Sequence, residues 1–180
     1  MRVSHSELYA VCKKVFEGLG FPHGVDEDAA FMVSWVELHG LEGLDRLRIA
    51  LPALLADRSP ARLELLSEDS HSAVIDARGA SALAVSPAAI DMASALAAED
   101  RPAHVELRNC GDEIFAVAPA VRASELRGQR FEIRWSGGGE DYVFAGRDRN
   151  SSCLNVRSGG SGQVVDRAGL SIRCACADFD

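Results

Sequence analysis

Residues 72–108 decide the fold of this chain, because they read as a strand, a helix and a second strand in succession. The segment opens with Ser72-Ala73-Val74-Ile75-Asp76, continues through an alanine-rich run over residues 84–98, and closes with Ala103-His104-Val105-Glu106-Leu107-Arg108. The two end segments have the apolar pattern of short strands. Ser86 as N-cap and Pro87 in the first turn would begin the helix between them. This order predicts a βαβ unit with two parallel strands.

Three short helices are expected before this unit. Ser4 and Glu7 have the spacing of a capping box, so a helix should begin there and end at Gly20. A second helix is expected over residues 26–39, where its acidic first turn suits the helix dipole. A third is expected over residues 44–56.

The segment after residue 108 predicts one more helix and then strands. The helix should run over residues 112–126, with a bend at Pro119. Short β-type runs separated by glycines follow, at residues 131–135, 141–144, 153–156, 163–165 and 170–174. They predict a C-terminal antiparallel β-meander. The class is therefore α+β: N-terminal helices, a βαβ-like middle and the meander. We divide the chain into residues 1–124 and residues 125–180, packed as one domain.

Composition excludes several kinds of protein. The 180 residues carry a formal charge of −8, which disfavours a surface that must neutralise many nucleic-acid phosphates. No apolar run is long enough to span a membrane, and the N-terminus turns polar at once, without a signal region. Five cysteines form no paired framework, so reduced thiols are expected. These features predict a cytoplasmic protein that binds neither nucleic acid nor membrane.

Several motifs are more simply explained by local structure than by chemistry. The glycine runs at residues 137–139 and 158–162 open no helix and are interpreted as turns, not phosphate loops. Cys174 and Cys176 have the wrong spacing for a metal site, so none is predicted. Asp69-Ser70-His71 is interpreted as a solvated turn, not a catalytic triad.

The densest polar patch lies over residues 37–48, where the second helix meets the third. A carboxylate ligand could be held there by Arg48, with Glu42 and Asp45 beside it, while His39 transfers a proton. The alternative is a solvated turn between helices, in which surface ion pairs contribute little.

The same patch carries a resemblance to a known family. Glu37-Leu38 and Gly40 match an acid, a Leu and a Gly that close a helix in that family, and Arg48 matches an Arg that follows. Asn109 matches the first residue of an Asn-Ser-Asn-His motif. Residues 4–120 thus resemble the N-terminal portion of the type-2 malate/L-lactate dehydrogenases. The resemblance implies a dimeric, nicotinamide-dependent oxidoreductase acting on small 2-hydroxy or 2-oxo acids, in which a His exchanges the hydroxyl proton.

Among the positions that depart from the family's pattern, three bear most directly on the chemistry. Leu44 stands at the place of that His, Pro52 at the place of a Tyr and Asp112 at the place of a second His. Because leucine has no titratable atom, it cannot exchange a proton. We therefore expect a binding or partner module on a dehydrogenase scaffold, without hydride transfer, in which Arg48 and Asn109 remain to bind a small carboxylate.

Two enzyme hypotheses stay open. One is an enzyme of altered chemistry, with His39 or His104 as acid/base and Arg48 as the carboxylate clamp. The other is a nicotinamide-dependent dehydrogenase. We expect no bound cofactor, since NAD(P) follows only from the resemblance. A homodimer or another protein is the expected partner.

Overall fold

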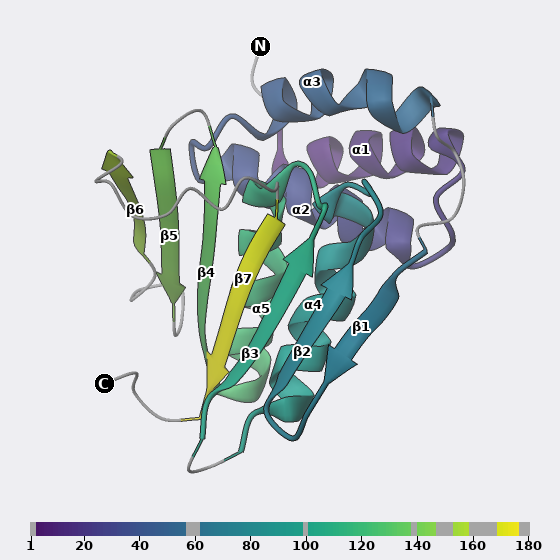
Figure 1. The fold of residues 1–180 in the computed structure, drawn as a ribbon. Coiled ribbons are helices and arrows are strands. Elements are labelled where there is room, and N and C mark those ends of the chain that lie inside the picture. The colour runs from purple at the N-terminus through teal and green to yellow at the C-terminus, as the bar shows by residue number, and fades with distance from the viewer. Residues whose placement is uncertain are drawn as a thin grey trace.

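The computed structural model describes residues 3–56, 62–98, 101–137, 140–146, 153–158 and 169–176. Its strands form one mixed, seven-stranded sheet in the order β1-β2-β3-β7-β4-β5-β6. Helices α4 and α5 lie behind the sheet, and α1, α2 and α3 gather at one end of it (Figure 1). The class is α+β, as the sequence predicts.

The three N-terminal helices begin and end close to where local signals place them. Helix α1 (His5–Leu19) starts with a capping box between Ser4 and Glu7 and ends at Gly20, whose φ is +86°. Helix α2 (Val25–Leu38) and helix α3 (Gly43–Ala56) follow. The N-cap position of α2 is Gly24, and its backbone N–H donates to Asp26 Oδ1 at 2.8 Å.

Helix α3 crosses α2 at very close range. A Cβ atom built on Gly43 would lie 2.5 Å from the backbone oxygen of Val33 and 2.7 Å from the backbone nitrogen of Glu37. The Glu37 carboxylate accepts a hydrogen bond from the backbone N–H of Leu44 at 3.0 Å. It therefore satisfies one of the free amides in the first turn of α3.

The central βαβ unit is present, and its helix begins earlier than predicted. Strand β2 (Ser72–Asp76) pairs in parallel with β3 (Ala103–Arg108), and α4 (Ala82–Leu96) connects them. The N-cap of α4 is Ser81, whose hydroxyl accepts from Leu83 N–H at 3.2 Å. The prediction of Ser86 as the cap was wrong: its buried hydroxyl donates to the carbonyl of Ala82, one turn earlier.

One strand was missed by sequence reasoning. Strand β1 (Glu64–Glu68) pairs antiparallel with β2 at the edge of the sheet, with a bulge between Leu65 and Ser67. All five of its residues are exposed, so the strand has no alternating pattern to reveal it. Asp69 closes the β1–β2 turn by accepting from the backbone N–H groups of His71 and Ser72, at 2.8 and 2.7 Å.

The helix predicted over residues 112–126 is divided in two. A 3₁₀ turn, η1 (Glu113–Ala116), leads into α5 (Val117–Arg127). The division falls before Pro119, which occupies the first turn of α5. A proline is tolerated there, because the N–H it lacks would have no partner within the helix.

The C-terminal strands differ from a simple meander. Strands β4 (Arg130–Gly137), β5 (Glu140–Gly146) and β6 (Cys153–Ser158) pair in order and antiparallel. Strand β7 (Gly169–Ala175) instead returns to lie between β3 and β4, antiparallel to both. It thereby joins the N-terminal and C-terminal parts of the chain in one sheet. The run predicted at residues 163–165 lies outside the described residues.

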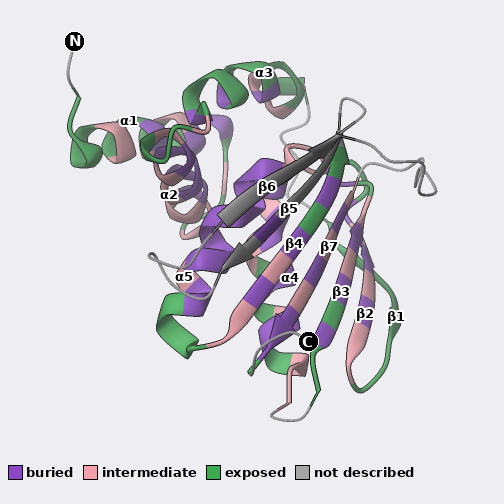
Figure 2. Ribbon diagram, turned by 90° about the vertical axis from the view of Figure 1, so that its left-hand side faces the viewer, coloured by how far each residue is buried: buried purple, intermediate pink, exposed green. Residues whose placement is uncertain are grey.

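One face of the sheet packs against α4 and α5. Buried residues alternate with half-buried or exposed ones along β3, β7 and β4 (Figure 2). The buried set forms the core under the two helices: Ala103, Val105, Leu107, Phe131, Ile133, Trp135, Leu170, Ile172 and Cys174. The opposite face carries polar groups, such as His104 Nε2, which lies 3.0 Å from Ser171 Oγ.

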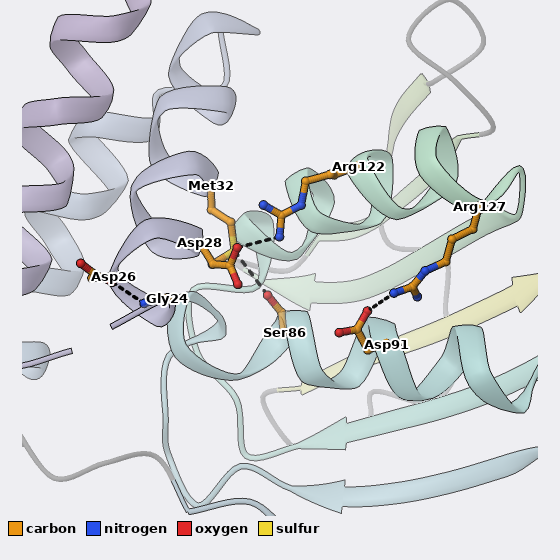
Figure 3. Close-up of polar contacts among 8 residues, drawn as sticks. All are labelled: Gly24, Asp26, Asp28, Met32, Ser86, Asp91, Arg122 and Arg127. Atoms are coloured by element: carbon orange, nitrogen blue, oxygen red, sulfur yellow. Dashed lines mark hydrogen bonds and ion pairs between the residues drawn. The ribbon is translucent and has the colours of Figure 1, made fainter. Parts of the chain in front are cut away.

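Ion pairs connect the helices to each other (Figure 3). Arg122 of α5 donates to Asp28 of α2 at 2.7 Å, and its guanidinium lies 4.8 Å from the ring centre of Phe31. Arg127 of α5 donates to Asp91 of α4, also at 2.7 Å. These contacts, together with the buried apolar core, fix α2 against the layer formed by α4 and α5.

Candidate functional site

A cavity of about 530 Å³ opens where the carboxyl ends of β2 and β3 meet the N-terminal helices. Its walls come from residues 19–25 around the α1–α2 connection, residues 49–54 of α3, residues 77–84, and residues 111–112. Arg62, just before β1, completes it. This volume is typical of sites for small organic molecules.

The chain reaches this place through two loops bonded to each other. Loop 77–81 follows β2 and loop 109–112 follows β3. The N–H of Gly79 donates to the carbonyl of Asn109, and the N–H of Ala82 donates to the carbonyl of Gly111, both at 2.8 Å. These bonds make the two loops one rigid wall.

Three non-glycine residues in these loops have left-handed backbone conformations. The φ angles are +52° at Arg78, +52° at Asn109 and +58° at Asp112. Such conformations cost of the order of 1 kcal/mol each for residues other than glycine, and they persist where surrounding contacts impose them. The carboxylate of Asp76 is one such contact, because it accepts from Arg78 N–H at 2.7 Å and from the Asn109 amide at 2.9 Å. Strain concentrated beside a cavity is typical of binding sites.

The N-terminus of α4 faces this wall but is already satisfied. Its first amide, on Ala82, donates to Gly111, and the amide of Leu83 donates to the hydroxyl of Ser81 at 3.2 Å. A phosphate site at a helix N-terminus needs free amides. The cavity therefore offers side-chain charges and apolar walls as its means of recognition.

Three charged side chains line the cavity. Arg78 forms an ion pair with Glu64 of β1, so its charge is balanced within the protein. Among the described residues, Arg62 and Asp112 have no hydrogen-bonding side-chain partner and no ion pair. The apolar side chains of Phe21 and Leu54 belong to the same walls.

The residue after Asp112 is a second carboxyl group in a different environment. Glu113 is half-buried at the start of η1, and its pKa is raised above the ordinary value by burial, with a further contribution from the charge of Asp112. Burial also raises the pKa of the neighbouring Cys110 thiol, so this cysteine stays protonated. A buried carboxyl group whose pKa is raised is suited to act as a general acid.

The residues proposed for catalysis and binding at the α2–α3 connection lie outside the cavity lining. The His39 ring stacks on Trp35 at 3.7 Å between centres, and its Nδ1 donates to the carbonyl of Trp35 at 2.7 Å. Arg48 Nε lies 3.3 Å from Asp45 Oδ1, and both side chains are more than two-thirds exposed. Glu42 has a φ of +58° and accepts a helical backbone bond from residue 46.

Two other predicted residues have structural partners. Asn109 lies beside the cavity, where its amide binds Asp76 and its carbonyl binds Gly79. His104 belongs to the polar face of the sheet. In the described part of the chain no group of His, Cys, Asp or Glu side chains is arranged to hold a metal ion. No helix of that part is long and apolar enough to cross a bilayer.

Sequence reasoning missed Arg62, Arg78 and the cavity itself. A signal was present, because ligands of open α/β sheets commonly bind beyond the carboxyl ends of parallel strands. The two predicted parallel strands end at Asp76 and Arg108. The residues that follow them are the ones that form the wall.

Comparison with solved structures identifies the architecture. Malate dehydrogenase from Pyrococcus horikoshii OT3 superimposes with a TM-score of 0.71 at 17% identity. Sulfolactate dehydrogenase from Methanocaldococcus jannaschii gives a TM-score of 0.70 at 16% identity. The fold is that of the malate and sulfolactate dehydrogenases. In both comparisons the match covers 91% of this chain and 52% of the other. The chain therefore spans about half the length of these enzymes.

One further solved structure has the same fold, and two comparisons of the sequence add no function. A dehydrogenase from Sinorhizobium meliloti gives a TM-score of 0.72 at 18% identity, over 90% of this chain and 56% of that one. Residues 3–90 match a family model described as a protein of unknown function, DUF3726. Among curated proteins, none matches the sequence. The expected resemblance to the malate/L-lactate dehydrogenases is confirmed at the level of the fold, over about half the length of those proteins.

Proposed function

We propose that this protein binds a small carboxylate in the cavity and does not carry out hydride transfer. The observation that carries the proposal is the cavity of about 530 Å³, with apolar walls and the guanidinium of Arg62 without a partner among the described residues. An arginine without an internal partner suits a ligand carboxylate, because its fork can donate two parallel hydrogen bonds. Two proteins of this fold are named for malate and sulfolactate, and both compounds are small carboxylates.

The residues of α3 support a role without dehydrogenase chemistry. Leu44, where the resemblance expects the proton-exchanging His, is exposed, and its backbone N–H is bound by Glu37. Arg48 is turned to solvent and paired with Asp45. Proton exchange needs a titratable group within reach of the substrate hydroxyl, which a leucine does not offer.

An enzyme acting on small 2-hydroxy or 2-oxo acids is the second candidate. It is favoured by the pair Asp112 and Glu113, because the raised pKa of Glu113 provides a carboxyl that stays protonated at higher pH than usual. The use of NAD(P) by such an enzyme is suggested only by its fold. Oxidation of NADH with a panel of 2-oxo acids, followed at 340 nm, tests it. Turnover that is lost in the Glu113→Gln variant would favour the enzyme over the binding protein.

We propose that the protein also associates with a second copy of itself. Strand β1 lies at the edge of the sheet and exposes Leu65 and Leu66, each close to half accessible. Ile49 and Leu55 on α3 are exposed as well. Exposed apolar side chains beside an unpaired strand edge are typical of surfaces that another chain covers.

Binding is tested by filling the cavity. Ala53 lines the cavity from an exposed position of α3, so Ala53→Trp should block it without disturbing the core. A ligand at a hundred times its dissociation constant stabilises by about 2.7 kcal/mol, which raises Tm by roughly 5–10 °C for a chain of this size. We expect such a shift with small carboxylates, and its loss in Ala53→Trp. Ala56→Trp, an identical substitution at an exposed position of the same helix outside the cavity lining, is the control. An equal shift in both variants would refute this site.

A further inference from the structure

The charges that line the cavity specify more than a carboxylate. Arg62 provides a positive charge and Asp112 a negative charge, and neither is paired within the described part of the chain. The third charge, on Arg78, is balanced by Glu64. The cavity is therefore close to neutral overall, with one unpaired charge of each sign.

The conformation of Asp112 indicates that its carboxylate is not used to stabilise the fold. Asp112 stands at the N-cap of η1, where an aspartate ordinarily accepts a hydrogen bond from a backbone N–H of the first turn. Here it makes no such bond. Its backbone is also left-handed, with a φ of +58°, a conformation that aspartate and asparagine adopt more readily than other residues with a Cβ atom. The chain thus holds a charged side chain at the cavity wall without the capping hydrogen bond that usually explains an aspartate at this position.

An anionic carboxylate alone is a poor complement to such a site. A ligand that fills the cavity and places only a carboxylate on Arg62 would cover Asp112 without giving it a partner, which is unfavourable. A second carboxylate on the ligand would be repelled by Asp112. A ligand that carries an ammonium group as well as a carboxylate satisfies both side chains.

The remaining walls select the rest of the ligand. Phe21, Leu54 and Ala84 present carbon atoms to the cavity, and the amides at the start of α4 are already bonded. The three side chains have no polar group of their own. They suit a compact hydrocarbon group, which gains by leaving water.

We propose that the ligand is an apolar α-amino acid bound as a zwitterion, with its carboxylate on Arg62 and its ammonium on Asp112. This rests on the proposed binding function and narrows its ligand class. Such a ligand differs from malate, a dicarboxylate, and from sulfolactate, a sulfonate, for which two dehydrogenases of this fold are named.

The test compares matched ligands by isothermal titration calorimetry at pH 7.5. L-Leucine and L-proline are the zwitterions, and 4-methylpentanoate and cyclopentanecarboxylate lack only the ammonium group. Succinate represents the dicarboxylates. We expect at least one amino acid to bind, at least tenfold more tightly than its analogue without nitrogen and than succinate.

Substitutions assign the two charges. Asp112→Asn keeps the size of the side chain and tolerates the left-handed backbone, since asparagine adopts it more readily than most residues. It should weaken amino-acid binding at least tenfold, and it should not weaken binding of the deaminated analogue, because the unpaired charge that disfavours that analogue is removed. Arg62→Gln should weaken both. Glu68→Gln, an exposed acid on β1 outside the cavity lining, is the control and should change neither.

The outcomes separate the two proposals. The zwitterion is refuted if 4-methylpentanoate or succinate binds as tightly as the amino acids. It is also refuted if Asp112→Asn has no effect on amino-acid binding. In either case carboxylate binding stands. If none of these probes binds, or if binding persists in Ala53→Trp, both proposals are overturned.

Discussion

Replacing Gly43 by alanine tests the closest helix crossing in the structure. The added Cβ would lie 2.5 Å from the Val33 carbonyl oxygen and 2.7 Å from the Glu37 nitrogen. Non-bonded heavy atoms prefer separations of about 3.5 Å, so α2 and α3 must move apart by roughly 1 Å. Neither neighbouring atom can rotate away, because both belong to the backbone of α2.

The magnitude follows from the kind of strain. Overpacking of this sort costs about 1–3 kcal/mol, and the bond from Leu44 N–H to Glu37 lengthens as the helices separate. At about 2–4 °C per kcal/mol for this chain length, Tm should fall by roughly 2–12 °C. Urea unfolding followed by circular dichroism measures the change in the free energy of unfolding.

Gly18→Ala is the matched control. Gly18 lies inside α1, and a Cβ there would meet nothing within 4 Å. The same substitution should therefore stabilise the protein by about 0.5–1 kcal/mol, because alanine is the better helix former. We therefore predict that the two substitutions change the free energy of unfolding in opposite directions. A Gly43→Ala protein as stable as the wild type would refute the crossing as described.

Two further predictions concern pH and association. The folded-state pKa of Glu113 is raised, so the folded protein holds this proton more tightly than the unfolded chain does; stability should fall as pH rises from the ordinary value of 4.5 through the raised pKa. In urea unfolding from pH 4 to pH 8, Glu113→Gln should remove this loss, and identical pH profiles would contradict it. If a second copy covers β1, light scattering should give twice the chain mass, and Leu65→Lys should give the monomer; a monomeric wild type would exclude the dimer.

The parts of the fold that sequence reasoning predicted are those with local causes. The capping box at Ser4 and Glu7 and the stop at Gly20 depend on residues within one or two helical turns. The start of α4 was misplaced because Ser86 and Pro87 look like a helix start. The actual start depends on the bond from Ala82 to Gly111, which comes from the loop after β3.

The missed features depend on residues far apart in the sequence. Strand β7 lies between β3 and β4, an arrangement that no pattern within residues 169–175 reveals. The cavity likewise takes Arg62 from one segment and Asp112 from another. Arg62 looks like an ordinary surface residue by itself, and Asp112 was singled out only through the family resemblance. The polar patch at residues 37–48 was conspicuous because its charges are adjacent in sequence, and the structure explains several of them by ion pairing and helix capping.

The position of β7 determines the order in which this protein can fold. His104 on β3 and Ser171 on β7 are 67 residues apart in the chain, so closing that loop carries a large entropic cost before any contact repays it. During synthesis, β3 can pair with β2 as soon as both have left the ribosome, but its other edge stays open until residue 175 has emerged. A nascent chain paused between residues 137 and 169 would therefore expose two unpaired strand edges, those of β3 and β4. That interval is when the protein is most vulnerable to aggregation and most dependent on a chaperone.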